Sequence, residues 1–162
     1  MTIPVAYPLT VYYDASCPLC RAEMETLESR AKADALRLVD CSAAGFDEQT
    51  VAAEGITRAD LMSRIHARDA AGRWLRGMDV FAAVYAAAGL NVLARIYASR
   101  ALRPLLDRLY PWIADHRQAL SRFGLPHLFA WLARKAPASC RDCARGPSRR
   151  DVSVKMPPSA NR

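Results

Sequence analysis

The chain has 162 residues, of which 52% are hydrophobic, and its formal net charge is +7. This length and composition fit one globular domain with a core of its own. The longest uncharged stretch, residues 80–94, is too short to span a bilayer, and the first eight residues do not resemble a signal peptide. We therefore expect a cytoplasmic protein without a membrane span.

The positive charge is concentrated at the C-terminal end of the chain. Residues 134–162 hold 8 basic and 2 acidic residues, whereas the preceding residues hold 15 and 14. This tail contains Pro and Ser and no aromatic residue, so we expect a disordered, solvated end and no nucleic-acid-binding function. We accordingly place the domain at residues 1–135 and the basic tail at residues 136–162.

The hydrophobic pattern along the chain predicts strands and helices in the order βαβα followed by ββα. The predicted strands are residues 9–13, 36–39, 61–68 and 73–76, and the predicted helices are residues 17–33, 48–53, 57–60, 79–88, 92–99, 102–116 and 125–135. The first two strands should be parallel and joined by a right-handed crossover. This order predicts an α/β fold: a thioredoxin-like mixed β-sheet flanked by helices, with a C-terminal α-helical extension from about residue 90.

Three details of this prediction can be checked individually. Asp79 should cap its helix, and Gly89 should end it. Pro111 should kink or break the helix in which it lies. An apolar stripe on that helix should be buried against the rest of the domain; it consists of Leu102, Leu105, Leu106, Leu109 and Ile113.

The sequence Asp14-x-x-Cys17-x-x-Cys20 stands where the first strand gives way to the first helix. Cys17 should lie at the N-terminus of the helix, where free amide N–H groups and the helix dipole favour a thiolate and lower the pKa of this thiol. Cys20 follows on the same helix face, close enough to form a disulfide with Cys17. A Cys-x-x-Cys pair can also be half of a zinc site, but its position between a strand and a helix favours redox chemistry.

Cys17 is thus the predicted nucleophile, and Cys20 is the predicted resolving thiol. Asp14 has two possible roles that do not exclude each other. It could accept or donate a proton during the exchange, or it could accept backbone hydrogen bonds as a turn or helix-cap residue.

Three further cysteines have less definite roles. Cys41 should follow the second strand, near the dithiol, where it is either a third thiol or a buried inert residue, and we favour the latter. Cys140 and Cys143 form a second Cys-x-x-Cys pair in a polar segment. They could be a redox relay, half of a metal site or incidental thiols of a flexible tail, and we favour the last interpretation slightly.

These residues resemble the DCC family of predicted thiol-disulfide oxidoreductases, which is named for the motif Asp-x-x-Cys-x-x-Cys. The resemblance covers about residues 9–135 and includes a late helical segment with Tyr110, Trp112 and Arg117. It implies a thioredoxin-like fold and a redox activity. The cis-proline that thioredoxin-like proteins place before their third strand is missing, since no proline lies between Pro18 and Pro104.

We interpret the protein as a thiol-disulfide oxidoreductase that needs no cofactor. Its expected partners are a disulfide-containing protein or a low-molecular-weight thiol as substrate, and an upstream dithiol or glutathione as reductant. The alternative is a non-catalytic binding module on the same fold, whose cysteines stay idle or hold zinc.

Overall fold

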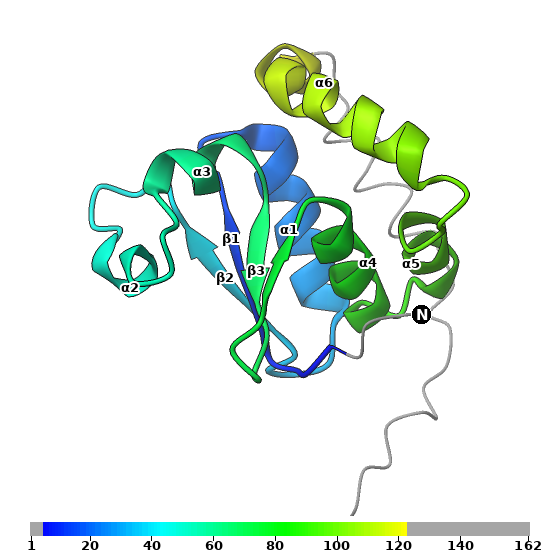
Figure 1. Ribbon diagram of the computed structural model, residues 1–162, viewed down its shortest axis with the longest axis horizontal. Helices are drawn as coiled ribbons and strands as arrows, with labels where there is room; N and C mark the ends of the chain where they lie inside the picture. Colours follow the sequence, from blue (N-terminus) through cyan, green and yellow to red (C-terminus); the bar gives the residue numbers. More distant parts are fainter. Residues whose placement is uncertain (1–4, 123–162) are drawn as a thin grey trace, which may run out of the picture.

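The computed structural model describes residues 5–122, which form a four-stranded sheet flanked by helices (Figure 1). The predicted helix at residues 125–135, the basic tail, Cys140 and Cys143 lie outside the described residues. The elements in chain order are β1 (Leu9–Tyr13), α1 (Pro18–Arg30), β2 (Leu36–Asp40), α2 (Gln49–Ala52), α3 (Arg58–Ser63), β3 (His66–Arg68), β4 (Trp74–Arg76), α4 (Met78–Ala87), α5 (Asn91–Tyr97) and α6 (Arg103–Arg122).

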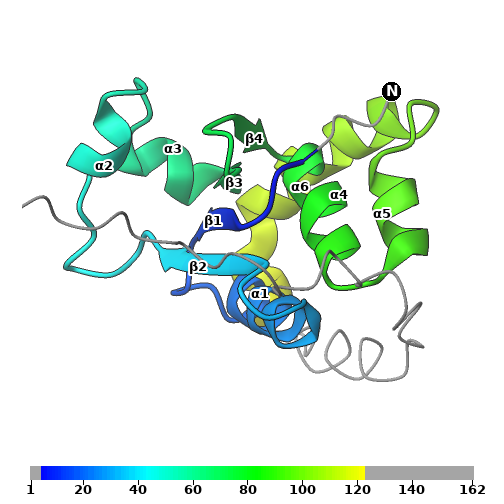
Figure 2. The same cartoon turned by 90° about the horizontal axis from the view of Figure 1, so that it is seen from below.

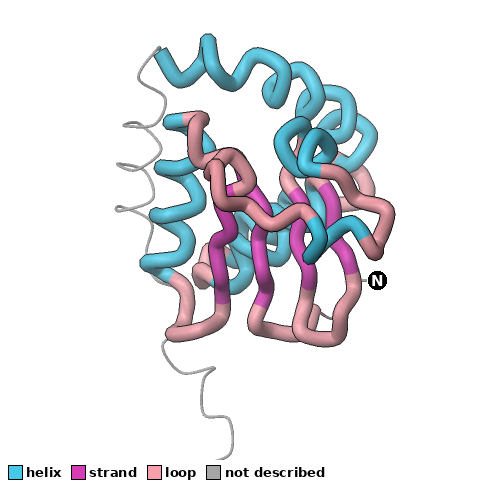
Figure 3. Tube along the Cα trace, turned by 90° about the vertical axis from the view of Figure 1, so that its left-hand side faces the viewer, coloured by secondary structure: helices cyan, strands magenta, loops and turns pink. Residues whose placement is uncertain are grey.

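The strands of the sheet follow one another in the order β2-β1-β3-β4 (Figure 3). β1 and β2 are parallel, with Leu9 opposite Leu36, whereas β3 is antiparallel to both β1 and β4. The connection from β1 through α1 to β2 supplies the crossover that a parallel pair requires. The predicted α/β fold with a mixed sheet and flanking helices is confirmed.

Side chains of β1 alternate between two hydrophobic clusters on opposite faces of the sheet. Leu9, Val11 and Tyr13 belong to the cluster that includes residues of α1 and α4, while Tyr12 belongs to the cluster with α2 and α3. Figure 2 shows these two pairs of helices on opposite sides of the strands. The central strand is therefore covered on both faces, which explains its nearly uninterrupted apolar sequence.

The predicted strand at residues 61–68 is too long, because its first half is helical. Thr57 and Asp60 form a reciprocal capping box: the Thr57 side chain accepts a hydrogen bond from the backbone N–H of Asp60, and the Asp60 carboxylate accepts one from that of Thr57. This cap satisfies free N–H groups at the start of α3, and the helix then continues to Ser63. Strand β3 is left with His66–Arg68.

Asp79 does not cap α4, contrary to the prediction. The N-cap residue is Gly77, whose φ of 54° is accessible to a residue without a side chain. The Asp79 carboxylate lies in the first turn and accepts a hydrogen bond of 2.6 Å from Arg103 of α6. Gly89, with a φ of 74°, follows the end of α4 as predicted.

The helical extension packs on α4 through aromatic side chains. The ring of Phe81 lies 5.4 Å from that of Tyr97 in α5 and 5.6 Å from that of Tyr110 in α6. Pro111 does not break α6, which continues to Arg122. None of the described helices is long and apolar enough to cross a membrane.

The predicted apolar stripe is only partly buried: Leu106 and Ile113 are half-buried, whereas its other three leucines are exposed. The side of α6 that carries Tyr110 faces the body of the domain, so that part of the stripe points away from it. Leu105 is 62% exposed, and Leu102 and Leu109 are also exposed.

Candidate dithiol site

The loop from β1 to α1 places Cys17 at the N-cap of α1. Pro18 occupies the first helical position, where its missing N–H has no cost. The loop is fixed at Ala15, whose N–H donates to Asp40 of β2 (3.1 Å) and whose carbonyl accepts a hydrogen bond from Arg21 (2.9 Å). Hydrogen bonds to Asp40 at the end of β2 and from Arg21 of α1 thus hold the backbone just before Cys17 in position.

Cys17 and Cys20 form a close, reduced pair. Their sulfur atoms are 2.8 Å apart, with the Cys20 thiol donating to Cys17, and the backbone N–H of Cys20 donates to the same sulfur at 3.4 Å. Cys17 is fully buried, whereas Cys20 is half-buried.

The environment separates the pKa values of the two thiols. The hydrogen bond from Cys20, backbone N–H groups and the positive charge of Arg117 together outweigh burial and lower the pKa of Cys17 to about 6. The same sulfur–sulfur hydrogen bond, together with burial, raises the pKa of Cys20. At neutral pH the pair therefore consists of a thiolate at Cys17 and a thiol at Cys20, which are the states that nucleophilic attack followed by resolution requires.

Asp14 is buried beside this pair, and both of its carboxylate oxygens are occupied. One oxygen accepts from the backbone N–H of Ser16 at 3.0 Å and from the Ser16 hydroxyl, as expected for a turn residue. The other accepts from Arg117 at 2.8 Å. The expected turn role is present in this geometry, while a role of Asp14 in proton transfer stays a prediction.

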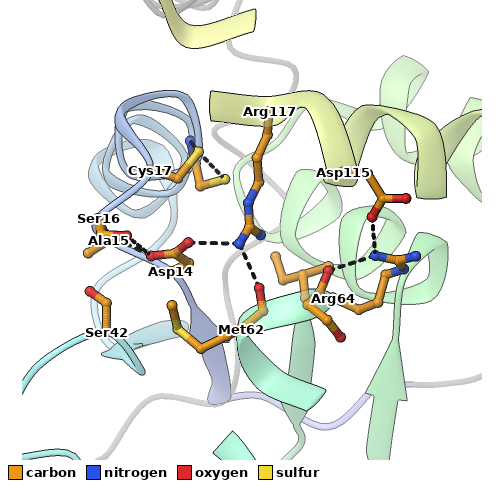
Figure 4. Close-up of polar contacts among 12 residues, drawn as sticks. Asp14, Ala15, Ser16, Cys17, Ser42, Met62, Arg64, Asp115 and Arg117 are labelled. Atoms are coloured by element: carbon orange, nitrogen blue, oxygen red, sulfur yellow. Dashed lines mark hydrogen bonds and ion pairs between the residues drawn. The ribbon is translucent and has the colours of Figure 1, made fainter. Parts of the chain in front are cut away.

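Arg117 joins three segments that are far apart in the sequence. From α6 its guanidinium donates to Asp14 at the end of β1 and, at 2.6 Å, to the carbonyl of Met62 in α3 (Figure 4). Sequence reasoning gave Arg117 no role, because nothing local to residue 117 indicates a contact 103 residues away. The helical extension is thus part of the dithiol site.

The segment before β3, where a cis-proline was expected and is missing, is held by the same helix. The backbone N–H of Ile65 donates to the hydroxyl of Tyr110 at 2.9 Å, close to the Arg117–Met62 contact. The one cis peptide bond within residues 5–122 joins Tyr7 and Pro8. Two backbone groups of this segment are therefore already paired with side chains of α6.

Comparison with known proteins agrees with this site. Residues 11–123 match the DCC1-like thiol-disulfide oxidoreductase family. The chain belongs to this family. It is also similar to an uncharacterized chloroplastic protein of Arabidopsis thaliana, with 26% identity over 141 residues that cover 86% of this chain and 64% of that protein. The chain spans less than two thirds of the length of that relative, and no solved structure matches.

A small pocket of about 70 Å³ adjoins Cys20 in this family member. One functional candidate that lines it, Glu23, was not identified from the sequence. Glu23 lies one helical turn beyond Cys20 and lines the pocket with Cys20, Asp14 and Arg117. Its carboxylate accepts a hydrogen bond of 2.8 Å from Tyr85, and burial raises its pKa to about 7. The three-residue spacing from Cys20 was a signal that could have identified it.

Cys41 is placed differently from the dithiol. It follows β2 and is fully buried in the cluster with Val51, Ile56 and Leu61, on the α2 and α3 side of the sheet. Burial raises its pKa to about 12, which favours the inert interpretation. Within the described part of the chain, no group of three or more His, Cys, Asp or Glu side chains is arranged to hold a metal ion.

The lowered pKa predicts selective modification of Cys17. Its alkylation rate with iodoacetamide should increase with pH to an inflection near pH 6 and then level off, because the thiolate is the reacting form. Cys41 should stay unmodified until the protein unfolds. Peptide mapping by mass spectrometry at a series of pH values measures both, and an inflection at the ordinary thiol pKa of about 8.5 would contradict the site geometry.

Proposed function

We propose that this family member reduces disulfides of a protein or of a low-molecular-weight thiol through Cys17 and Cys20, without a cofactor. The observation that carries the proposal is the thiolate–thiol pair whose sulfur atoms are 2.8 Å apart at the start of α1. An upstream dithiol or glutathione would return the resulting disulfide to the reduced state. We further propose the cytoplasm as its compartment, because its reducing conditions maintain such a pair.

The reaction has two steps. The Cys17 thiolate attacks one sulfur of the substrate disulfide and forms a mixed disulfide, and the other substrate sulfur leaves as a thiolate. Cys20 then loses its proton and attacks Cys17, which releases the second substrate sulfur and leaves a Cys17–Cys20 disulfide. Because Cys17 is fully buried, the residues that cover it must move for the first step.

The Cys20→Ser variant tests this function, because it lacks the resolving thiol and should remain covalently joined to its substrate. Mixed disulfides captured in cells should be identified by mass spectrometry after alkylation of free thiols. The matched control is the Cys17→Ser, Cys20→Ser double variant, in which these adducts should disappear.

Equal adducts in both variants, or none in either together with an unreactive Cys17, would contradict the proposal. The binding-module alternative would then be favoured, and the metal content of the purified protein would show whether its cysteines hold zinc.

A further inference from the structure

Resolution of the mixed disulfide requires a proton acceptor for Cys20. In the reduced protein the Cys20 proton is shared with the Cys17 thiolate, which raises the pKa of Cys20. Once Cys17 is bound to substrate its negative charge is gone, and the Cys20 proton must leave before Cys20 can attack. Asp14 is poorly placed to take it, because its oxygens already hold Arg117 and Ser16.

Glu23 is the other carboxylate at the pocket that adjoins Cys20. It lies three residues after Cys20 in α1, so both side chains project from the same face of the helix. Tyr85 of α4 holds one carboxylate oxygen through a 2.8 Å hydrogen bond, and it is the one described residue that donates to this carboxylate. The pocket is large enough to hold water, which can relay a proton between the two side chains.

We propose that Glu23 accepts the proton of Cys20 across this pocket and then supplies it to the leaving substrate thiolate. This inference rests on the proposed function. Its steps balance: Glu23 carboxylate and Cys20 thiol become carboxylic acid and thiolate, and the thiolate attacks Cys17 as the Cys17–substrate bond breaks. The released substrate thiolate takes the proton, so that Glu23 is a carboxylate again, the protein dithiol is oxidised and the substrate disulfide is reduced.

The surroundings of Glu23 suit this exchange at neutral pH. Burial raises its pKa to about 7, the hydrogen bond from Tyr85 lowers it, and the Cys17 thiolate raises it further. Loss of that thiolate in the mixed disulfide therefore lowers the pKa of Glu23 and favours its carboxylate form when a base is needed. The ionisable groups that face Glu23 or line its pocket are Tyr13 of β1, Asp14 after it, Cys17 at the N-cap of α1, Cys20 of α1, Tyr85 of α4, Tyr97 of α5, and Tyr110 and Arg117 of α6.

Reduction of 5,5′-dithiobis(2-nitrobenzoate) by the full chain separates the two steps. Attack by Cys17 releases one coloured thiolate and resolution by Cys20 releases the second, so stopped-flow absorbance should show two phases. This leaving group departs without a proton, and the second phase therefore reports the deprotonation and attack of Cys20. Cys140 and Cys143 should be replaced by serine to remove their own reaction with the reagent.

Glu23→Gln keeps the size of the side chain and an oxygen that can accept from Tyr85. It should leave the first phase within about two-fold of wild type and slow the second by about 100-fold, the range of general base catalysis. The second-phase rate of wild type should rise with pH to an inflection at or below about pH 7, which the variant should lack. Glu25→Gln, an exposed change of the same charge on α1, should leave both phases unchanged.

Tyr85→Phe provides a second test that keeps the carboxylate. Loss of the hydrogen bond that lowers the pKa of Glu23 should move the second-phase inflection to higher pH. A second phase in Glu23→Gln that equals wild type at every pH, or an unmoved inflection in Tyr85→Phe, would overturn the role of Glu23 and leave the proposed function standing. Absence of the first phase in wild type would instead overturn the proposed function.

Discussion

Replacement of Cys17 by serine should lower thiol-disulfide exchange by at least about 1,000-fold, because a serine hydroxyl stays protonated at neutral pH and does not attack a disulfide. Cys20 should not take over this role, because burial still raises its pKa when the hydrogen bond with Cys17 is gone. The rate of reduction of a small aromatic disulfide at neutral pH, followed by absorbance, measures the loss.

Cys41→Ser is the matched control for this prediction. It removes a fully buried cysteine of the other hydrophobic cluster and should keep the wild-type rate in the folded protein. Exchange that persists in Cys17→Ser would contradict the assignment of the nucleophile. If that residual exchange disappeared on further replacement of Cys140 and Cys143, the second Cys-x-x-Cys pair would be the reactive one.

The Arg117→Met variant should lose both stability and thiolate character. The Asp14 side chain is only 2% exposed, so removal of its ion-pair partner leaves a buried charge that only the Ser16 hydrogen bonds stabilise, and we expect the free energy of unfolding to fall by about 3 kcal/mol. The pKa of Cys17 should rise, because the positive charge of Arg117 helps to lower it. Urea unfolding at neutral pH and the pH profile of Cys17 alkylation measure the two effects.

Two further variants separate this ion pair from general damage to α6. Arg108→Met removes an exposed arginine from the same helix and should change neither measurement. The Arg117→Met, Asp14→Asn double variant removes the buried charge as well and should regain most of the lost stability. An Arg117→Met protein as stable as wild type would contradict the importance of this contact.

The contacts of Arg117 and Tyr110 make the helical extension part of the dithiol site. α6 supplies the cation beside the dithiol and pairs with the backbone of the segment before β3. The family match ends at residue 123, one residue beyond α6, so the matched region includes the helix that completes the site. A substrate could pair with the backbone of this segment only if α6 moved away. Otherwise it must bind at another surface of the protein.

Local sequence signals predicted the position of the Cys-x-x-Cys pair in the fold. The run at residues 9–13 predicted the buried strand β1, and Cys17 lies at the helix start where the motif placed it. The same kind of reasoning was wrong at residues 61–63, where an alternating pattern suggested a strand and the capping box of Thr57 and Asp60 formed a helix. At these residues the alternating pattern favoured a strand and the capping box favoured a helix, and the structure is helical.

The sequence by itself determined most strands and helices in their order along the chain, the dithiol and its position at a helix N-terminus, because periodicity, proline and capping act between residues close in the chain. The tertiary structure alone decided that Arg117 reaches Asp14 and that Tyr85 reaches Glu23 across 62 residues. It thereby decided the protonation states of the site. A pKa depends on burial and on which charges and donors are brought near, and those neighbours come from distant parts of the chain.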